Sequence, residues 1–324
     1  MVIYNTFIKG MIKVKAIVFG GTGFIGSHTV EQLRLKGHEV TAVVRQTSDT
    51  SFLDSLGVRV VKVDFSKTES LGEIIKGHQT VYNCTADANL STEVNLEAPV
   101  EIGLTRELLK QGALNGVERF IQLSSIVVYD FRTNKPITES YDIRPEYPIQ
   151  ELLLKREEIV QEIGKETDMV TIILRPASAI GPRDKASFFS RLLKNHVDNK
   201  FPFLKNGQTI VSLVDTRDIG RAMEWLGTYK MFTKKQNVFL LKGFDTTWGS
   251  LKAAIDEARG TVANVHDLSK IVEENTSMSY VLSTFSTNRI WDDEKIRSLG
   301  FKTKYSQTES VQYAVRDLIK RNFI

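Results

Sequence analysis

The stretch that decides the fold is Gly20-Gly21-Thr22-Gly23-Phe24-Ile25-Gly26. It directly follows a short apolar run, Lys15–Phe19, and leads into a segment with helical spacing, Thr29–Lys36, which stops at Gly37. A strand, a glycine turn and a helix in this order are typical of a dinucleotide-binding unit, in which the glycines allow a tight turn, close approach to a pyrophosphate and close helix packing. The free N–H groups at the helix N-terminus then hold the phosphates.

Apolar runs alternate with helical patterns through the first half of the chain. Further strands are expected at Glu39–Val44, Val58–Val63, Thr80–Asn83, Arg119–Leu123 and Val170–Leu174, with helices at Glu69–Lys76, Val100–Leu114 and Ile149–Ile163. This alternation predicts an α/β fold with a doubly wound parallel Rossmann sheet, followed by a smaller C-terminal α/β substrate lobe. We expect the Rossmann domain over residues 12–176, with a return segment of about 209–242, and the substrate lobe over 177–208 and 243–324.

Composition and charge indicate an ordinary globular chain. The net charge is +4, and the Lys and Arg residues are scattered, so we expect a solvated surface and no nucleic-acid partner. No window holds the ~20 apolar residues that span a bilayer, so we expect no membrane partner and a cytoplasmic protein. The five histidines lack metal-ligand spacing, which predicts no metal. Cys84, at the end of a strand, is expected to be a buried small side chain.

The end of the second strand bears on the choice of cofactor. A site for NAD usually places an acidic residue there to hold the ribose 2′-hydroxyl. This chain has Val43-Val44-Arg45 instead. A guanidinium suits a 2′-phosphate, so the sequence favours NADP(H), with NAD as the alternative and a plain surface role for Arg45 left open.

Four strong and two weaker segments resemble the extended short-chain dehydrogenase/reductase family, the NAD-dependent epimerase and dehydratase group, over about residues 14–305. They are Phe19–Gly26, Val63-Asp64-Phe65, Leu123–Tyr129, Leu174–Pro182 and weaker matches within 206–219 and 295–301. The resemblance implies that Asp64 and Phe65 contact the adenine. It also implies that the cofactor is contacted by Gly20, Thr22, Gly23, Phe24, Ile25, Gly26, Arg45, Thr85, Ala86, Lys155 and Pro176.

The family's chemistry is hydride transfer between nicotinamide C4 and a substrate carbon. A tyrosine phenol exchanges the substrate's hydroxyl proton, and a lysine four residues later on the same helix face lowers the tyrosine pKa and holds the nicotinamide ribose. A serine on the preceding strand bonds the substrate oxygen. The resemblance implies that Ser125 is this serine and Lys155 this lysine, with the alternative that Ser125 simply satisfies backbone groups at a strand end.

The tyrosine is where the sequence departs from the family, because no Tyr-x-x-x-Lys lies in the expected stretch. Glu151 stands four residues before Lys155, and Tyr147 lies a further turn upstream, where Pro148 keeps it at or before the helix start. Three hypotheses stay open. Tyr147 acts as the acid, Glu151 carries the proton with a raised pKa, or the site is degraded and Glu151–Lys155 is an ordinary ion pair.

Two classes of function follow from these observations. The first is an NAD(P)-dependent oxidoreductase, epimerase or dehydratase that acts on a nucleotide-activated sugar or a similar polar small molecule. The second is a catalytically degraded NADP(H)-binding sensor or scaffold. Arg183 and Arg289 are candidate contacts for a substrate diphosphate, with a surface position as the alternative for Arg183. The resemblance also implies a homodimer formed through two long helices. Leu104, Leu108, Leu152 and Leu153 could contribute to it, although core burial explains these leucines as well.

Overall fold

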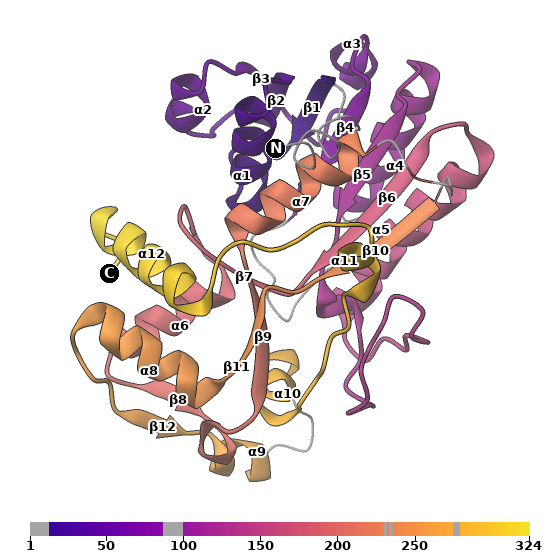
Figure 1. Ribbon diagram of the computed structural model, residues 1–324. Helices are drawn as coiled ribbons and strands as arrows, with labels where there is room; N and C mark the ends of the chain where they lie inside the picture. The colour runs from indigo at the N-terminus through magenta and orange to yellow at the C-terminus, as the bar shows by residue number, and fades with distance from the viewer. Residues whose placement is uncertain (1–12, 87–99, 230–231, 233–235, 275–278) are drawn as a thin grey trace, which may run out of the picture.

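The large sheet is parallel throughout and is centred on β1. In the computed structural model, which describes residues 13–86, 100–229, 232, 236–274 and 279–324, its strand order is β10-β6-β5-β4-β1-β2-β3. This order confirms the doubly wound Rossmann sheet, and Figure 1 shows it in the upper half of the molecule. The strands are β1 (Lys15–Phe19), β2 (Glu39–Arg45), β3 (Arg59–Val63), β4 (Thr80–Asn83), β5 (Arg119–Leu123), β6 (Val170–Pro176) and β10 (Gln236–Leu241).

Helices cover both faces of this sheet. Along β1, Ala16 and Val18 point into one apolar cluster and Ile17 and Phe19 into the other, so the strand is buried on both sides. The first face carries α1 (Phe24–Leu35) and α7 (Thr216–Thr228), which pack against each other. The opposite face carries α3 (Leu71–Ile75), α4 (Val100–Leu114) and α5 (Pro148–Glu166).

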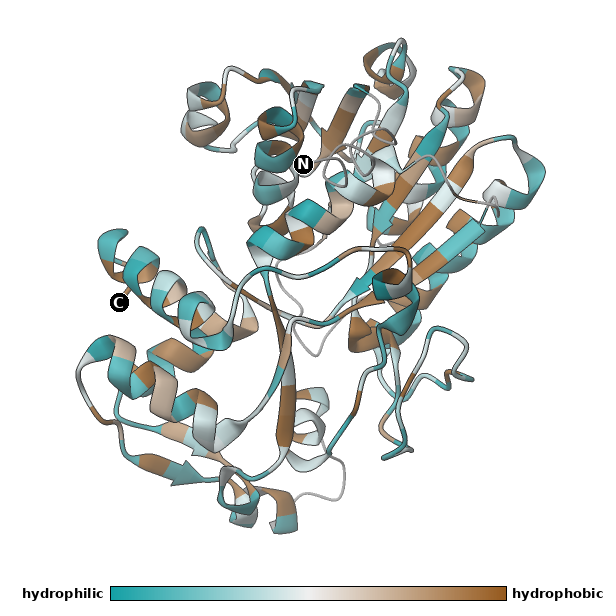
Figure 2. Cartoon of the chain, in the orientation of Figure 1, coloured by the Kyte–Doolittle hydropathy of each residue, from teal (hydrophilic) through white to brown (hydrophobic). Residues whose placement is uncertain are grey.

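A smaller lobe lies below the sheet and has its own core, as Figures 1 and 2 show. Trp248 and Phe285 stack there with ring centroids 4.1 Å apart, beside fully buried Phe189 and Phe201. Its strands form the sheets β11-β9-β7 and β12-β8. The elements are β7 (Ser178–Ile180), α6 (Phe188–Val197), β8 (Phe201–Phe203), β9 (Ile210–Asp215), β11 (Phe244–Thr247), α8 (Trp248–Arg259), β12 (Val265–Asp267), α9 (Ser269–Glu274), α10 (Tyr280–Ser286) and α12 (Gln307–Lys320). The short helix α11 (Glu294–Ser298) packs instead against β10 of the large sheet.

Several elements differ from the expectation. Helix α1 begins at Phe24, five residues earlier than expected, so that the last glycine of the loop lies inside its first turn. A short helix, α2 (Ser51–Ser55), was not expected. Within the return segment of about 209–242, β10 joins the edge of the large sheet, whereas β9 pairs with β7 and β11. The domain bounds stay a prediction.

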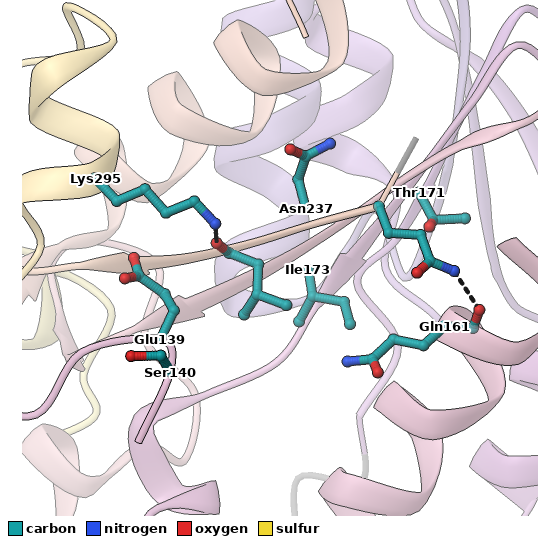
Figure 3. A pocket seen from close by; sticks show the side chains of 9 residues that line it. Glu139, Ser140, Gln161, Thr171, Ile173, Asn237 and Lys295 are labelled. Carbon is teal, nitrogen blue, oxygen red and sulfur yellow. Dashed lines mark hydrogen bonds between the residues drawn. The ribbon is translucent and has the colours of Figure 1, made fainter. Parts of the chain in front are cut away.

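The edge strand β10 is covered by side chains from neighbouring elements. Glu139 accepts a hydrogen bond from the backbone N–H of Leu240 at 2.8 Å, and the Lys295 ammonium donates to the carbonyl of Val238 at 2.6 Å. A hollow of about 320 Å³ opens beside these groups, and Figure 3 shows Glu139 and Lys295 among the side chains that line it. The glycine loop follows β1, four strands away, so we interpret this hollow as part of an edge protected against pairing with another chain.

Candidate functional site

The glycine loop is fixed by close backbone contacts. Gly20 has a φ of +81°, and its N–H donates to the carbonyl of Val43 at 2.9 Å. A Cβ on Gly20 would lie 2.8 Å from the Cys84 carbonyl oxygen, and one on Gly26 would lie 2.1 Å from the Gly20 carbonyl oxygen. No side chain fits at either position, because strand, turn and helix meet there backbone against backbone.

The N-terminus of α1 is left open toward the loop. Gly23 is the N-cap residue and offers no side-chain hydrogen bond, and the first turn carries no acidic residue. The N–H groups of this turn lack intrahelical acceptors, as in every helix. This geometry suits an anion at the loop, with Thr22, Phe24 and Ile25 around it.

The ends of β2 and β3 bring the predicted adenosine contacts to the same edge of the sheet. Arg45 ends β2 and is exposed, and its guanidinium makes no hydrogen bond or ion pair with the described residues. Asp64 follows β3, where hydrogen bonds from Ser66 lower the pKa of its carboxyl group. Phe65 is partly buried against the core. Arg45 is therefore available to a ligand.

The end of β4 carries a buried cation that the sequence analysis missed. The Arg156 side chain, from α5, donates to the Thr85 carbonyl at 2.9 Å and to the Thr105 hydroxyl at 3.1 Å. Arg156 is only 3% exposed, and burial lowers its pKa to about 10. Among the residues that the structure describes, no carboxylate forms an ion pair with Arg156. Thr85, one of the predicted cofactor contacts, is thus held in place, while Ala86 beside it is exposed.

The single cysteine lies next to this point but is inert. Cys84 is 7% exposed, and burial raises the pKa of its thiol to about 12. Its sulfur lies 3.9 Å from the hydroxyl of Thr29. The expectation of a buried small side chain is confirmed, since a thiol with this pKa is protonated and unreactive at neutral pH.

A buried network fixes α5 against the ends of β5 and β6. Ser124 donates to Glu157 at 2.5 Å, and Arg175 pairs with the same carboxylate. Arg175 also donates to the Tyr129 hydroxyl at 2.7 Å. Ser125, the predicted substrate-binding serine, is half-buried, and its Oγ accepts from the Val127 N–H at 3.2 Å. Glu157 therefore marks the side of α5 that faces this serine pair.

On this side of α5, Gln150 is buried and donates to the Tyr129 carbonyl at 2.8 Å, and the side chains at the spacing of the family pair are apolar. Positions four and eight residues before Glu157 share its face, and they are Leu153 and Ile149. Leu153 is 9% exposed and belongs to the core cluster, against which Ile149 packs. The tyrosine–lysine spacing of the family is thus occupied by an isoleucine and a leucine on this face.

Glu151 and Lys155 lie elsewhere on the helix. Both are exposed, and the Lys155 ammonium pairs with Glu158 at 3.1 Å, with more than half of each side chain in solvent. Lys155 is two residues before Glu157, which is about 200° around the helix. The structure does not bring either residue to Ser125. The sequence alone does not reveal that Glu157 faces Ser124, so it could not show that Lys155 lies on the other side of the helix.

Tyr147 is the N-cap residue of α5, as Pro148 predicted. Its hydroxyl shares a 2.8 Å hydrogen bond with Ser283 on α10, in the smaller lobe. Its ring packs edge-on against Phe131 and Tyr280, with centroids 5.9 and 5.6 Å away. The phenol therefore bridges the two lobes and already has a partner.

Both arginines proposed for a substrate diphosphate are engaged with protein groups. Arg289 is 6% exposed and lies 4.1 Å above the ring of Phe131. Arg183 donates to Ser27 at 3.1 Å and to Glu31 at 2.6 Å, on α1. Pro176, the last residue of β6, is buried. The contacts of Arg183 and Arg289 leave neither guanidinium free in this conformation.

Comparisons with known proteins agree with the fold. The model of the NAD dependent epimerase/dehydratase family matches residues 16–240. Sterol-4-alpha-carboxylate 3-dehydrogenase, decarboxylating, of Homo sapiens is 26% identical over 210 residues, covering 63% of this chain and 55% of that protein. UDP-glucose 4-epimerase of Vibrio cholerae is 28% identical over 216 residues, covering 63% and 64%. The matched region thus spans less than two thirds of either relative.

Solved structures share the whole architecture. MoeE5, in complex with UDP-glucose and NAD, superposes with a TM-score of 0.76 at 20% identity, over 96% of this chain and 100% of that one. At this identity the likeness shows the fold. In the parts of the chain that the structure describes, no helix is long and apolar enough to cross a membrane. Nor do three His, Cys, Asp or Glu side chains meet there in a metal-binding group.

Proposed function

The chain belongs to the NAD dependent epimerase/dehydratase family, and from that premise we propose that it binds NADP(H) without the family's tyrosine–lysine proton transfer. The protein then acts as a sensor or scaffold that responds to the bound cofactor. The observation that carries this proposal is the face of α5 beside Ser125, which presents Leu153 and Ile149. Neither side chain can donate, accept or shuttle a proton, and neither can hold a ribose hydroxyl.

The choice of NADP(H) rests on Arg45. Its guanidinium ends β2 without a protein partner among the described residues, beside a loop that offers no acidic side chain at the strand end. A planar guanidinium forms charge-assisted, bidentate hydrogen bonds with a phosphate. Its hydrogen bond to a neutral 2′-hydroxyl is weaker. NAD, which is bound in the MoeE5 complex, is the competing cofactor.

Titration calorimetry with NADPH and NADH tests this proposal. We expect NADPH to bind about tenfold more tightly, which is what one charge-assisted hydrogen bond contributes. The Arg45→Gln variant should bring the two affinities together. Tighter binding of NADH by the unaltered protein would overturn the preference for NADP(H), and no binding of either would overturn the proposal as a whole.

A second candidate function is an enzyme that acts on a nucleotide-activated sugar and uses Tyr147 as its acid. The observation that favours it is the position of this phenol between the lobes, bonded to Ser283. The chain is also similar in sequence to an enzyme of this kind, the UDP-glucose 4-epimerase of Vibrio cholerae. Turnover that is lost in Tyr147→Phe and kept in Glu151→Ala would favour this candidate.

A further inference from the structure

A lysine of the smaller lobe lies against the glycine loop. After β7 the chain runs back toward α1 (Figure 1), and the Lys185 ammonium donates to the Thr22 carbonyl at 3.1 Å. Its side chain is exposed and forms no ion pair with the described residues. An ammonium has three donors, so a ligand at the loop can bind the two that remain.

The charge of this ammonium also acts on the loop that follows β2. The pKa of Asp49 is lowered first by its hydrogen bonds from Ser51, and the positive charges of Lys185 and Lys62 lower it further. Asp49 lies four residues after Arg45. Lys185 is thus bonded to the glycine loop at Thr22, and its charge also acts on the carboxylate that follows Arg45 by four residues.

The backbone around Lys185 is held from both lobes. The Arg183 N–H donates to Asp317 on α12 at 2.7 Å, while the Arg183 guanidinium binds Glu31 on α1 and lies 4.1 Å above the ring of Phe52. Arg321, the C-cap residue of α12, donates to the Asp184 carbonyl at 2.6 Å. These contacts hold the two residues before Lys185, and the hydrogen bond to Thr22 locates its ammonium.

We propose that Lys185 is a second specificity-determining cation for the 2′-phosphate of NADP(H), together with Arg45. The inference rests on the proposed preference for NADP(H). Arg45 approaches from the end of β2 and Lys185 from the glycine loop, and a phosphate dianion can accept hydrogen bonds from both. Since Lys185 belongs to the smaller lobe, the 2′-phosphate also connects that lobe to the Rossmann domain.

Calorimetric titration with adenosine 2′,5′-bisphosphate and with adenosine 5′-monophosphate separates the 2′-phosphate from the rest of the cofactor. In Lys185→Gln we expect about tenfold weaker binding of the bisphosphate and a change of less than about twofold for the monophosphate. Arg45→Gln should act in the same direction, and Lys185→Arg should keep the difference between the probes. Lys110→Gln is the matched control, because Lys110 is an exposed lysine on α4, on the opposite face of the sheet.

Each other outcome contradicts the inference in a different way. If Lys185→Gln leaves the ratio of the two affinities unchanged while Arg45→Gln lowers it, Lys185 is no specificity residue and the proposed function stands. If Lys185→Gln weakens both probes equally, its role is in general loop structure and the inference fails. If the unaltered protein binds both probes equally, the preference for NADP(H) and the role of Lys185 fail together.

Discussion

The glycine loop and the start of α5 lie at the same edge of the parallel sheet, but only the loop keeps the residues that the family pattern requires. At the loop, Gly20 and Gly26 stand where any Cβ would collide with backbone, and Gly23 leaves the helix N-terminus open. At α5, the face beside the serine pair carries Ile149 and Leu153. The comparison teaches that the proposed cofactor binding depends on backbone geometry, which the glycines preserve, whereas proton transfer depends on side chains, and those at the family's tyrosine–lysine spacing are apolar here.

The helix itself is not displaced. The network from Ser124 through Glu157 to Arg175 holds α5 against the ends of β5 and β6. The proposed loss of proton transfer therefore concerns a helix that is held in place, so the two regions can be tested independently.

The largest effect is expected from breaking the network under α5. Arg175→Met leaves the Glu157 carboxylate buried without its cation, so the free energy of unfolding should fall by about 3–5 kcal/mol. Urea denaturation measures this change. The double variant Glu157→Leu/Arg175→Met should recover much of the loss, because it leaves no unpaired charge. A loss below about 1 kcal/mol in Arg175→Met would mean that α5 is held by other contacts.

The next effect concerns the loop. In Gly26→Ala the new Cβ would meet the Gly20 carbonyl oxygen, so the loop must open. We expect a loss of about 3 kcal/mol of stability and at least about a hundredfold weaker NADPH binding. The control is Gly103→Ala on α4, where a Cβ meets nothing within 4 Å and should leave both properties unchanged or raise stability slightly. Unaltered NADPH affinity in Gly26→Ala would contradict the assignment of this loop.

A smaller effect is expected from pH at the contact between α1 and the smaller lobe. His28 is buried with Nδ1 beside the Arg183 guanidinium and Nε2 bonded to the Pro182 carbonyl, and burial lowers its pKa below 6.5. Burial raises the pKa of Glu31, but its contacts with His28 and the hydrogen bond from Arg183 outweigh it and lower that pKa to about 2.

Both groups bind protons more readily in the unfolded chain, so their contributions are complete above pH 6.5 and decline as the pH falls. We expect urea denaturation to show about 1–2 kcal/mol less stability at pH ~4 than at pH ~7 from this contact. The variant His28→Gln should show a shallower decline. The same pH dependence in protein and variant would contradict the role of His28.

The smallest effects are expected on the solvent side of α5. Lys155→Ala and Glu151→Ala should change stability by less than about 0.5 kcal/mol and leave NADPH affinity unchanged, because both side chains lie in solvent. Leu153→Ala provides the contrast on the buried side and should cost about 2 kcal/mol or more. A marked loss of NADPH affinity in Lys155→Ala would restore that lysine to the site.

Local patterns predicted much of the fold. The bounds of β4, α4 and β5 are those expected, because each has a clear apolar period between breakers. Helix α2 was missed because five residues are too short to show a period. The sheet partners of β9 and β10 were not predictable, since apolar runs of this kind pair equally well in either sheet.

The site was predictable where a local pattern marks its residues, and not where only distant contacts do. The glycines and Arg45 are identified by their place after a strand, which sequence reveals. The run Lys155-Arg156-Glu157-Glu158 contains two buried and two exposed charges, and nothing local distinguishes them. Only the contacts with Ser124 and Thr85 show that Arg156 and Glu157 face inward. The same register shows that Leu153 and not Lys155 faces the serines.

One measurement tests the central claim most directly. The unaltered protein, saturated with NADPH, is mixed with UDP-glucose and related nucleotide sugars and ketosugars, and the near-ultraviolet absorbance of the reduced nicotinamide is followed together with the products. The account predicts tight binding of NADPH, no oxidation of the cofactor and no altered sugar. Sustained conversion of any of these substrates, abolished by Tyr147→Phe or by Lys155→Ala, would contradict it.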